Sequence, residues 1–123
     1  MVKSFRDLIV WQKAHKLTLD LYKITKEFPA EKKFGLVSQI RRAVSSIPTN
    51  IVEGYKRRTT KEFMHFINIA DASLEEIRYL LLLLYDLNYI KNIIYQELNC
   101  SCDEIGKMIG GLEKSLKIKN NSH

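Results

Sequence analysis

Hydrophobic residues recur every three or four positions along most of the chain, which is the spacing of one face of an α-helix. Residues 5–28 carry the first apolar stripe, and this helix is expected to end before Pro29, because proline disfavours helical backbone at the preceding residue. Residues 35–57, 59–88 and 92–118 carry three further stripes. Four amphipathic helices joined by short turns predict an all-α, antiparallel up-down-up-down four-helix bundle.

The second stripe contains the segment SSIPTNIVEGYKRR (residues 45–58), which raises the question of a proline inside a helix. Ile47 and Ile51 keep the i, i+4 spacing on either side of Pro48, so we expect the helix to continue through it. A kink is expected at Pro48, because the proline ring clashes with the carbonyl of residue i−4. Gly54 falls on the same stripe, where its missing side chain would let a neighbouring helix approach closely.

The third stripe begins with Thr59 and Glu62, which have the spacing of a capping box. Its C-terminal half is apolar nearly all round, whereas a bundle buries only one face of each helix. We therefore expect a second burial partner, most simply another copy of the chain; the alternative is a helix that lies unusually deep in its own bundle. The residues assigned to this oligomer interface are Leu80, Leu82, Leu83 and Leu87.

The chain has 123 residues, of which 46% are hydrophobic. This predicts a single domain over residues 1–119, followed by a frayed tail at 120–123. Arg6 and Asp7 stand where the apolar part of a signal peptide would lie. The longest apolar run is far shorter than the roughly 20 residues that a membrane span needs. We therefore expect a cytoplasmic protein that does not contact a membrane.

The positive charge is concentrated in the second quarter of the chain. The whole chain has a net charge of +6, but residues 32–61 carry eight basic residues and one acidic residue, Glu53, which leaves −1 for the rest. Such a local excess suits a polyanionic partner, and a solvated helix face is the alternative. Aromatic residues do not interleave with these cations, so we expect phosphate contacts without stacking platforms or base-specific readout. The predicted nucleic-acid-binding residues are Lys32, Lys33, Arg41, Arg42, Lys56, Arg57, Arg58 and Lys61.

Candidate metal-binding and catalytic residues are few. Cys100 and Cys102 are two positions apart, so on a helix their side chains point about 200° from each other and cannot chelate one ion. Glu62 and His65 have the Glu-x-x-His spacing of carboxylate metal sites in bundles, but they fall off the core stripe and the motif has no second copy. No histidine belongs to a recognisable set of base, nucleophile and orienting group. We expect no metal, no cofactor, no catalytic residues and two reduced thiols.

Three short motifs carry a resemblance to a known family. They are VWQKA at residues 10–14, QIRRA at 39–43 and SIPTNIVEG at 46–54. Over about residues 5–90 the chain resembles the four-helix bundle proteins of 23S ribosomal RNA intervening sequences. Members of this family are often encoded by insertions within bacterial 23S ribosomal RNA genes.

The resemblance implies a bundle that assembles into a homopentameric ring. Similar bundles are accessory proteins of the reverse transcriptases of diversity-generating retroelements, where they bind nucleic acid. The family has no established catalytic activity, so the resemblance implies that the chain is not an enzyme. The chain departs from the family at Val52, where alanine is usual, and at Asp71-Ala72-Ser73, where a glycine commonly precedes the serine. Both changes affect packing detail rather than the fold.

Two hypotheses for function follow. The first is a homo-oligomer that binds nucleic acid through its basic surface, with RNA favoured over DNA and ribosomal RNA as one candidate ligand. The second is a structural or adaptor module that binds a protein partner, such as a reverse transcriptase. The excess of apolar residues on the third helix suits assembly in either case.

Overall fold

The computed structural model describes residues 2–121, except for the side chains of residues 32–34. Within this part of the chain there are four long helices and no strand, which confirms the prediction of an all-α four-helix fold. The long helices are α1 (Ile9–Lys26), α3 (Ser38–Tyr55), α4 (Thr60–Asp86) and α5 (Asn92–Asn121). The 3-10 turn η1 (Phe5–Asp7) precedes α1. Two short helical segments, α2 (Ala30–Lys32) and η2 (Lys33–Val37), join α1 to α3.

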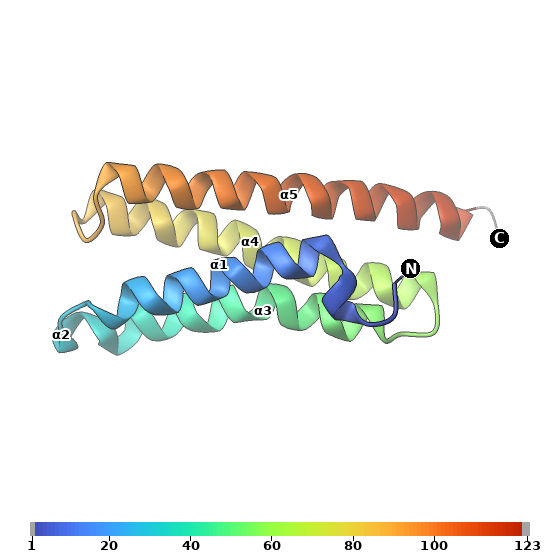
Figure 1. Cartoon of the computed structure of the whole chain (residues 1–123), viewed down its shortest axis with the longest axis horizontal. Helices are drawn as coiled ribbons and strands as arrows, with labels where there is room; N and C mark the ends of the chain where they lie inside the picture. The colour runs from blue at the N-terminus through green and yellow to red at the C-terminus, as the bar shows by residue number, and fades with distance from the viewer. Residues whose placement is uncertain (1, 122–123) are drawn as a thin grey trace.

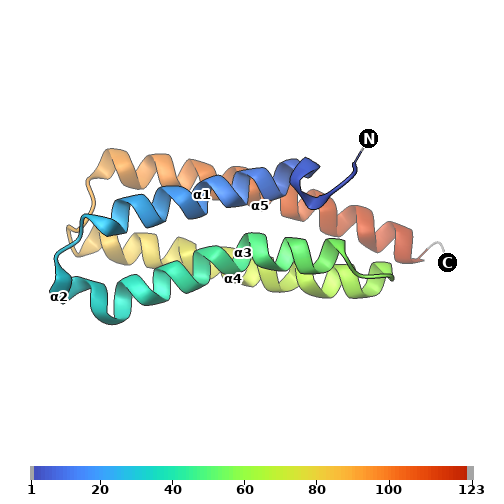
Figure 2. The same ribbon diagram turned by 60° about the horizontal axis from the view of Figure 1, so that its bottom comes forward.

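The helices lie side by side in a bundle (Figures 1 and 2). The connections from α1 to α3 and from α4 to α5 lie at one end of the molecule, and the α3–α4 turn lies at the other end, near both termini. The chain therefore doubles back at each connection. No described helix is long and apolar enough to cross a membrane.

Most of the predicted helix boundaries hold to within a few residues, with three differences. The first helix is predicted to begin at residue 5, but residues 5–7 form the 3-10 turn η1, Leu8 is extended, and α1 begins only at Ile9. The apolar spacing predicts that residues 35–37 begin the second helix, but they belong to the π-helical segment η2. Gly35 has a φ of 83°, which lies outside right-handed helical backbone, so the regular helix begins only at Ser38. The last helix continues to Asn121, beyond its predicted end at 118.

Both ends of α4 are fixed by local hydrogen bonds. At its start, the Thr59 hydroxyl accepts a bond of 3.1 Å from the Glu62 backbone N–H, which is one of the two bonds that the capping-box spacing predicts. At its end, Asn88 adopts a left-handed conformation with a φ of 64°. The N–H groups of Asn88 and Tyr89 then bond the carbonyls of Tyr85 and Leu84, each at 2.9 Å, which is a Schellman motif.

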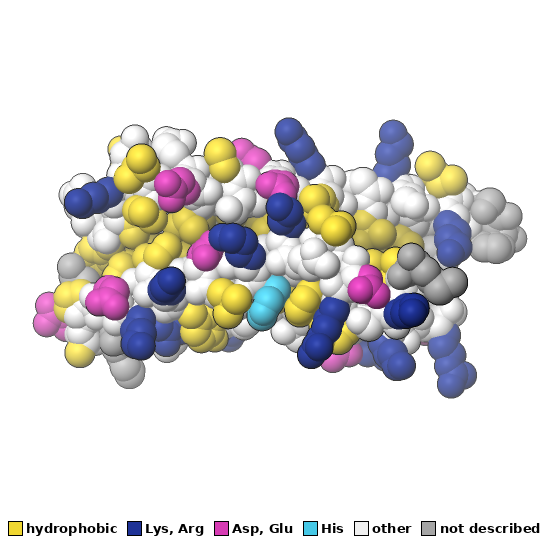
Figure 3. Space-filling model, viewed as in Figure 1, with side chains coloured by type: hydrophobic (Ala, Val, Ile, Leu, Met, Phe, Trp, Pro, Cys, Tyr) yellow, Lys and Arg dark blue, Asp and Glu magenta, His cyan; other side chains and the backbone are white. Residues whose placement is uncertain are grey.

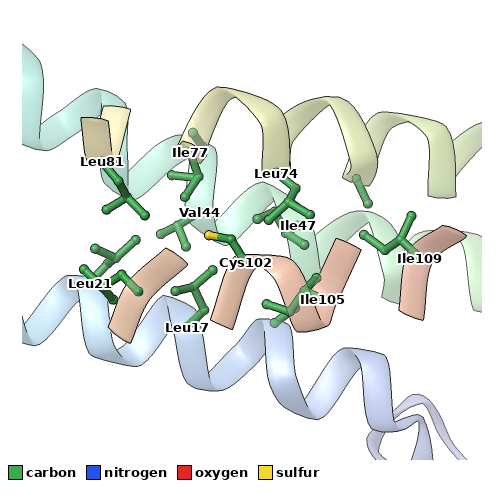
Figure 4. Close-up of a cluster of buried hydrophobic side chains, with 14 of the residues drawn as sticks. Leu17, Leu21, Val44, Ile47, Leu74, Ile77, Leu81, Cys102, Ile105 and Ile109 are labelled. Carbon is green, nitrogen blue, oxygen red and sulfur yellow. The ribbon is translucent and has the colours of Figure 1, made fainter. Parts of the chain in front are cut away.

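All four helices contribute to one core (Figure 4). The predicted stripes meet there, and the labelled side chains point toward one another: Leu17, Leu21, Val44, Ile47, Leu74, Ile77, Leu81, Cys102, Ile105 and Ile109.

Leu80 also belongs to this core, because its residue exposure is only 2%. The prediction that Leu80 lies at an exposed oligomer interface is therefore wrong. The physical reason is that α4 packs against both α3 and α5, which buries a wider arc of its surface than one stripe.

The helix α3 runs without interruption through Pro48, as the spacing of its apolar residues predicts. The kink at Pro48 stays a prediction. Because proline has no backbone N–H, the carbonyl of Val44 loses its usual intrahelical donor. The single O–H of Thr18, on α1, is shared between two carbonyl oxygens, that of Ala14 on its own helix at 2.8 Å and that of Val44 at 3.2 Å. A neighbouring helix therefore supplies a donor where the proline removes one.

This arrangement predicts an energetic coupling between Thr18 and Pro48. Thr18→Val keeps the side-chain shape and removes the hydroxyl, so it should destabilise the wild-type protein by about 1 kcal/mol. In a Pro48→Ala background the alanine N–H bonds the Val44 carbonyl, so the same change should cost less, by roughly 0.5 kcal/mol or more. Urea unfolding of the four proteins measures this difference, and Thr18→Ser is the control that retains the donor. Equal costs in the two backgrounds would contradict the coupling.

Candidate nucleic-acid interface

Four of the predicted cations lie together at the turn between α3 and α4. We call Lys56, Arg57, Arg58 and Lys61 the basic corner; all four are exposed. They gather because α3 ends at Tyr55 and α4 begins at Thr60, so the turn is too short to separate them. Figure 3 shows several Lys and Arg side chains standing out from the end of the molecule at which this turn lies.

The turn is short because α3 and α4 approach each other closely at Gly54. A Cβ atom on Gly54 would lie 2.8 Å from Cδ1 of Phe63, 3.0 Å from Cβ of Phe66 and 3.2 Å from the Phe63 carbonyl oxygen. Real Cβ contacts are rarely this short, so only glycine fits without a shift of the neighbours. The expectation that Gly54 permits a close helix approach is confirmed.

The close approach brings an aromatic ring to the basic corner. The guanidinium carbon of Arg57 lies 4.5 Å from the centroid of the Phe66 ring, within cation–π distance. Nη2 of Arg57 also lies 3.2 Å from Oε2 of Glu53, one turn earlier on the chain. The expectation that no aromatic residue lies among the cations is therefore wrong at this position. The sequence separates Phe66 from the corner, and only the folded turn places Arg57 over it.

An open groove of about 480 Å³ lies beside the corner, lined by Arg57, Lys61, Glu62, His65 and Phe66. The His65 ring packs edge-on against Phe66, with 5.3 Å between the ring centroids. Phe66 and His65 are the two groove residues with rings, and the sequence pattern predicts a binding role for neither. Among the described residues, no group of three or more His, Cys, Asp or Glu side chains is arranged to hold a metal ion.

The two arginines in the middle of the predicted set have different surroundings. Nε of Arg41 donates to Oγ1 of Thr25 at 3.0 Å, and its Nη2 donates to the Tyr22 carbonyl at 3.1 Å. The same guanidinium lies 4.7 Å from the Tyr22 ring centroid. Arg41 thus bonds a carbonyl in the last turns of α1, where a cation also suits the helix dipole. Arg42 is exposed instead.

The eight predicted cations therefore do not form one cluster. Arg42 and Lys56 are separated by most of α3, which corresponds to about 20 Å along the helix axis. The side chains of Lys32 and Lys33 lie outside the described residues, so the second predicted cluster stays a prediction.

The exposed apolar surface on α4 contains fewer of the predicted leucines than expected. Leu82 and Leu87 are 41% and 45% exposed, while Leu83 is half-buried. Tyr79, which is 60% exposed, extends this outer face of α4. With Leu80 in the core, three of the four predicted interface leucines remain available for a partner.

The two cysteines are free thiols with opposite environments, as their helix positions predict. Cys100 is exposed, whereas Cys102 is buried in the core. Burial raises the pKa of the Cys102 thiol to about 11, because the thiolate would lose its hydration there. Cys102 is thus a core residue.

Comparison with known families agrees with this architecture and with the motifs. The family model described as "23S rRNA-intervening sequence protein" matches residues 6–111. The chain belongs to this family. The match spans most of η1 and all of α1, α3 and α4, and it ends within α5.

One solved protein structure has a fold similar to that of this chain. It is a protein of unknown function from the S23 ribosomal protein family of Bacteroides thetaiotaomicron. The two chains are 28% identical, and the TM-score is 0.78 over 86% of this chain and 99% of that one. A comparison with curated proteins gives no match.

The contact at Gly54 predicts that two glycine substitutions have opposite effects on stability. Alanine favours helical backbone by about 1 kcal/mol over glycine, and overpacking costs about 1–3 kcal/mol. Gly54→Ala should therefore lower the free energy of unfolding by up to about 2 kcal/mol, because the Phe63 carbonyl and the Phe66 Cβ cannot rotate away. Gly110→Ala is the matched control: nothing lies within 4 Å of its added Cβ, so it should be neutral or stabilising. Urea unfolding of both variants measures the contrast, and two stabilised proteins would refute it.

Proposed function

We propose that the protein is a non-enzymatic bundle that binds nucleic acid, with RNA preferred, through the basic corner. The observation that carries this proposal is the pairing of the corner's charges. Arg57 forms an ion pair with Glu53, whereas Lys56, Arg58 and Lys61 form none among the residues that the structure describes. Three exposed cations at one turn, without carboxylate partners, are available to neutralise phosphates and release counterions.

The family supports RNA as the class of ligand. Its description links these proteins to intervening sequences of 23S ribosomal RNA, so ribosomal RNA is the first ligand to test. This function would place the protein in the cytoplasm, where that RNA is found. The proposal includes no catalytic step, and it gives the two described histidines a packing role: His15 stacks on Trp11 and His65 packs against Phe66.

The proposal predicts that RNA affinity depends more on the positive charge of the basic corner than on the total charge of the protein. Changing Lys56, Arg58 and Lys61 together to Gln should weaken RNA binding roughly 10-fold or more at low salt. It should also make the plot of log K against log salt shallower by about 2, because each lost phosphate contact contributes about 0.7 for a single strand. Fluorescence anisotropy with a ribosomal RNA fragment over a salt series measures both quantities.

The matched control changes Lys23, Lys26 and Lys91 to Gln, which removes the same charge from exposed residues at the other end of the bundle. This control should bind RNA nearly as the wild type does. Equal weakening in the two triple variants would mean that net charge, not the corner, controls binding. Affinity that does not change between low and physiological salt would contradict phosphate binding altogether.

We further propose that the outer face of α4 mediates self-assembly. Exposed leucines beside a large exposed tyrosine are the composition of a protein contact rather than of a solvated helix face. The resemblance to the intervening-sequence proteins implies a pentameric ring. A ring would repeat the basic corner and multiply its phosphate contacts. A different protein partner, such as a reverse transcriptase, is the alternative occupant of this face.

Self-assembly through α4 predicts the mass of two variants. The wild type should have a mass several times that of one chain. Leu82→Glu or Leu87→Glu should give monomers, because a buried unpaired carboxylate opposes association. Light scattering after size exclusion measures these masses. Ile93→Glu, at a 65% exposed position on α5, is the control and should leave the assembly intact. A monomeric wild type would contradict self-assembly and favour a different protein partner.

A further inference from the structure

We propose that the groove beside the basic corner holds an unpaired nucleobase, so that the corner binds single-stranded RNA in preference to a duplex. This inference rests on the proposed nucleic-acid binding and specifies its ligand. The base would stack on the outer face of the Arg57 guanidinium, while Lys61 and its neighbours in the corner contact the flanking phosphates.

The Arg57 guanidinium is held in place before any ligand arrives. The Phe66 ring supports one side of it at 4.5 Å, and the Glu53 carboxylate fixes its edge at 3.2 Å. The side chain nevertheless remains 42% exposed and lines the groove, so a ligand can reach it. A planar guanidinium stacks on aromatic rings and on bases alike, and a base placed there would extend a column that begins with Phe66. Because Arg57 is already ordered, stacking costs less side-chain entropy than it would on a free arginine.

The groove wall suits the face of a base better than a phosphate. Although four of its five residues have polar side chains, most of its exposed surface is apolar, because Phe66, the His65 ring and the alkyl stems form it. Glu62 stands in the same groove, and its carboxylate would repel a phosphate. The same carboxylate can accept hydrogen bonds from the amino group of adenine, cytosine or guanine. Glu62, His65 and Phe66 therefore form a base-facing wall of the groove, while Lys61 in the same groove and Lys56 and Arg58 in the turn contact the flanking phosphates.

A duplex cannot use this groove, because its bases are paired and stacked on one another. An A-form helix presents phosphates and 2′-hydroxyls to a protein, whereas unpaired nucleotides can turn their bases outward onto aromatic or arginine planes. The basic corner alone would bind both forms through phosphate charge. The groove adds a contact that only the single strand can make.

Arginine-to-lysine substitutions test this inference without a change in net charge. Arg57→Lys keeps the cation and removes the planar surface, so it should weaken binding of single-stranded oligoadenylate roughly 10-fold and leave the salt slope unchanged. Arg6→Lys makes the same exchange at an exposed arginine of η1, outside both the groove and the basic corner, and should change affinity less than about twofold. Phe66→Leu should weaken oligoadenylate binding in the same way as Arg57→Lys, after unfolding experiments show that it is folded.

Two further ligands separate base stacking from charge. Inorganic polyphosphate carries phosphates without bases, so the wild type and Arg57→Lys should bind it equally. Oligoadenylate annealed to oligouridylate should bind the wild type more weakly than the single strand does, and Arg57→Lys should reduce that difference. Fluorescence anisotropy with the labelled RNAs, and competition by polyphosphate, give all of these affinities.

The outcomes distinguish this inference from the proposal on which it rests. If the wild type binds none of these polyanions, both are overturned. If the wild type binds RNA but Arg57→Lys binds oligoadenylate as tightly, the base site is overturned and the phosphate-binding corner stands. The base site is likewise overturned, and the corner retained, if the wild type binds the duplex as tightly as the single strand.

Discussion

The close contact between α3 and α4 is the constraint on which the rest of the structure depends. Small residues make it possible: the hydroxyls of Ser46 and Ser73 lie 2.8 Å apart across the interface, and Asn50 donates to Ser46 at 3.0 Å. Further along, Gly54 lets α3 approach the first turns of α4. Because the helices are already in contact there, the chain reverses in a short turn, and that turn concentrates the cations. Packing of the core and charge at the surface thus have a common cause.

The sequence allows most of the fold to be predicted, because helical periodicity depends on local spacing. The stripes that contain Ile47, Leu74 and Ile105 are buried as the helical wheels predict. The assignment of Leu80 to an interface is wrong because a wheel does not show how many neighbours a helix has. The burial of α4 on two sides, against α3 and α5, is a tertiary property. Periodicity therefore predicts which face of a helix is buried, whereas the packing of neighbouring helices determines how wide that buried face is.

The candidate site is harder to predict than the fold, because cations that are adjacent in the sequence make different contacts in the structure. Arg41 and Arg42 are neighbours in sequence, yet Arg41 turns back to bond α1 while Arg42 faces solvent. Arg57 contributes to packing and also remains exposed, since its guanidinium packs on Phe66 and pairs with Glu53 while the side chain is 42% exposed. Counting charges treats these residues as equivalent. Their hydrogen-bond partners show that only some of the positive charge is free for a ligand.

The two proposed surfaces lie toward opposite ends of α4. Lys61 is in the first turn of the helix and Leu82 is near its end, which corresponds to about 30 Å along the axis. Association through the leucines would therefore leave the basic corner uncovered. It would also hold several corners in fixed positions, so that one RNA strand could contact more than one of them. The long, doubly supported α4 would make the proposed assembly and the proposed RNA binding compatible in so small a chain, because each would use a different end of the same helix.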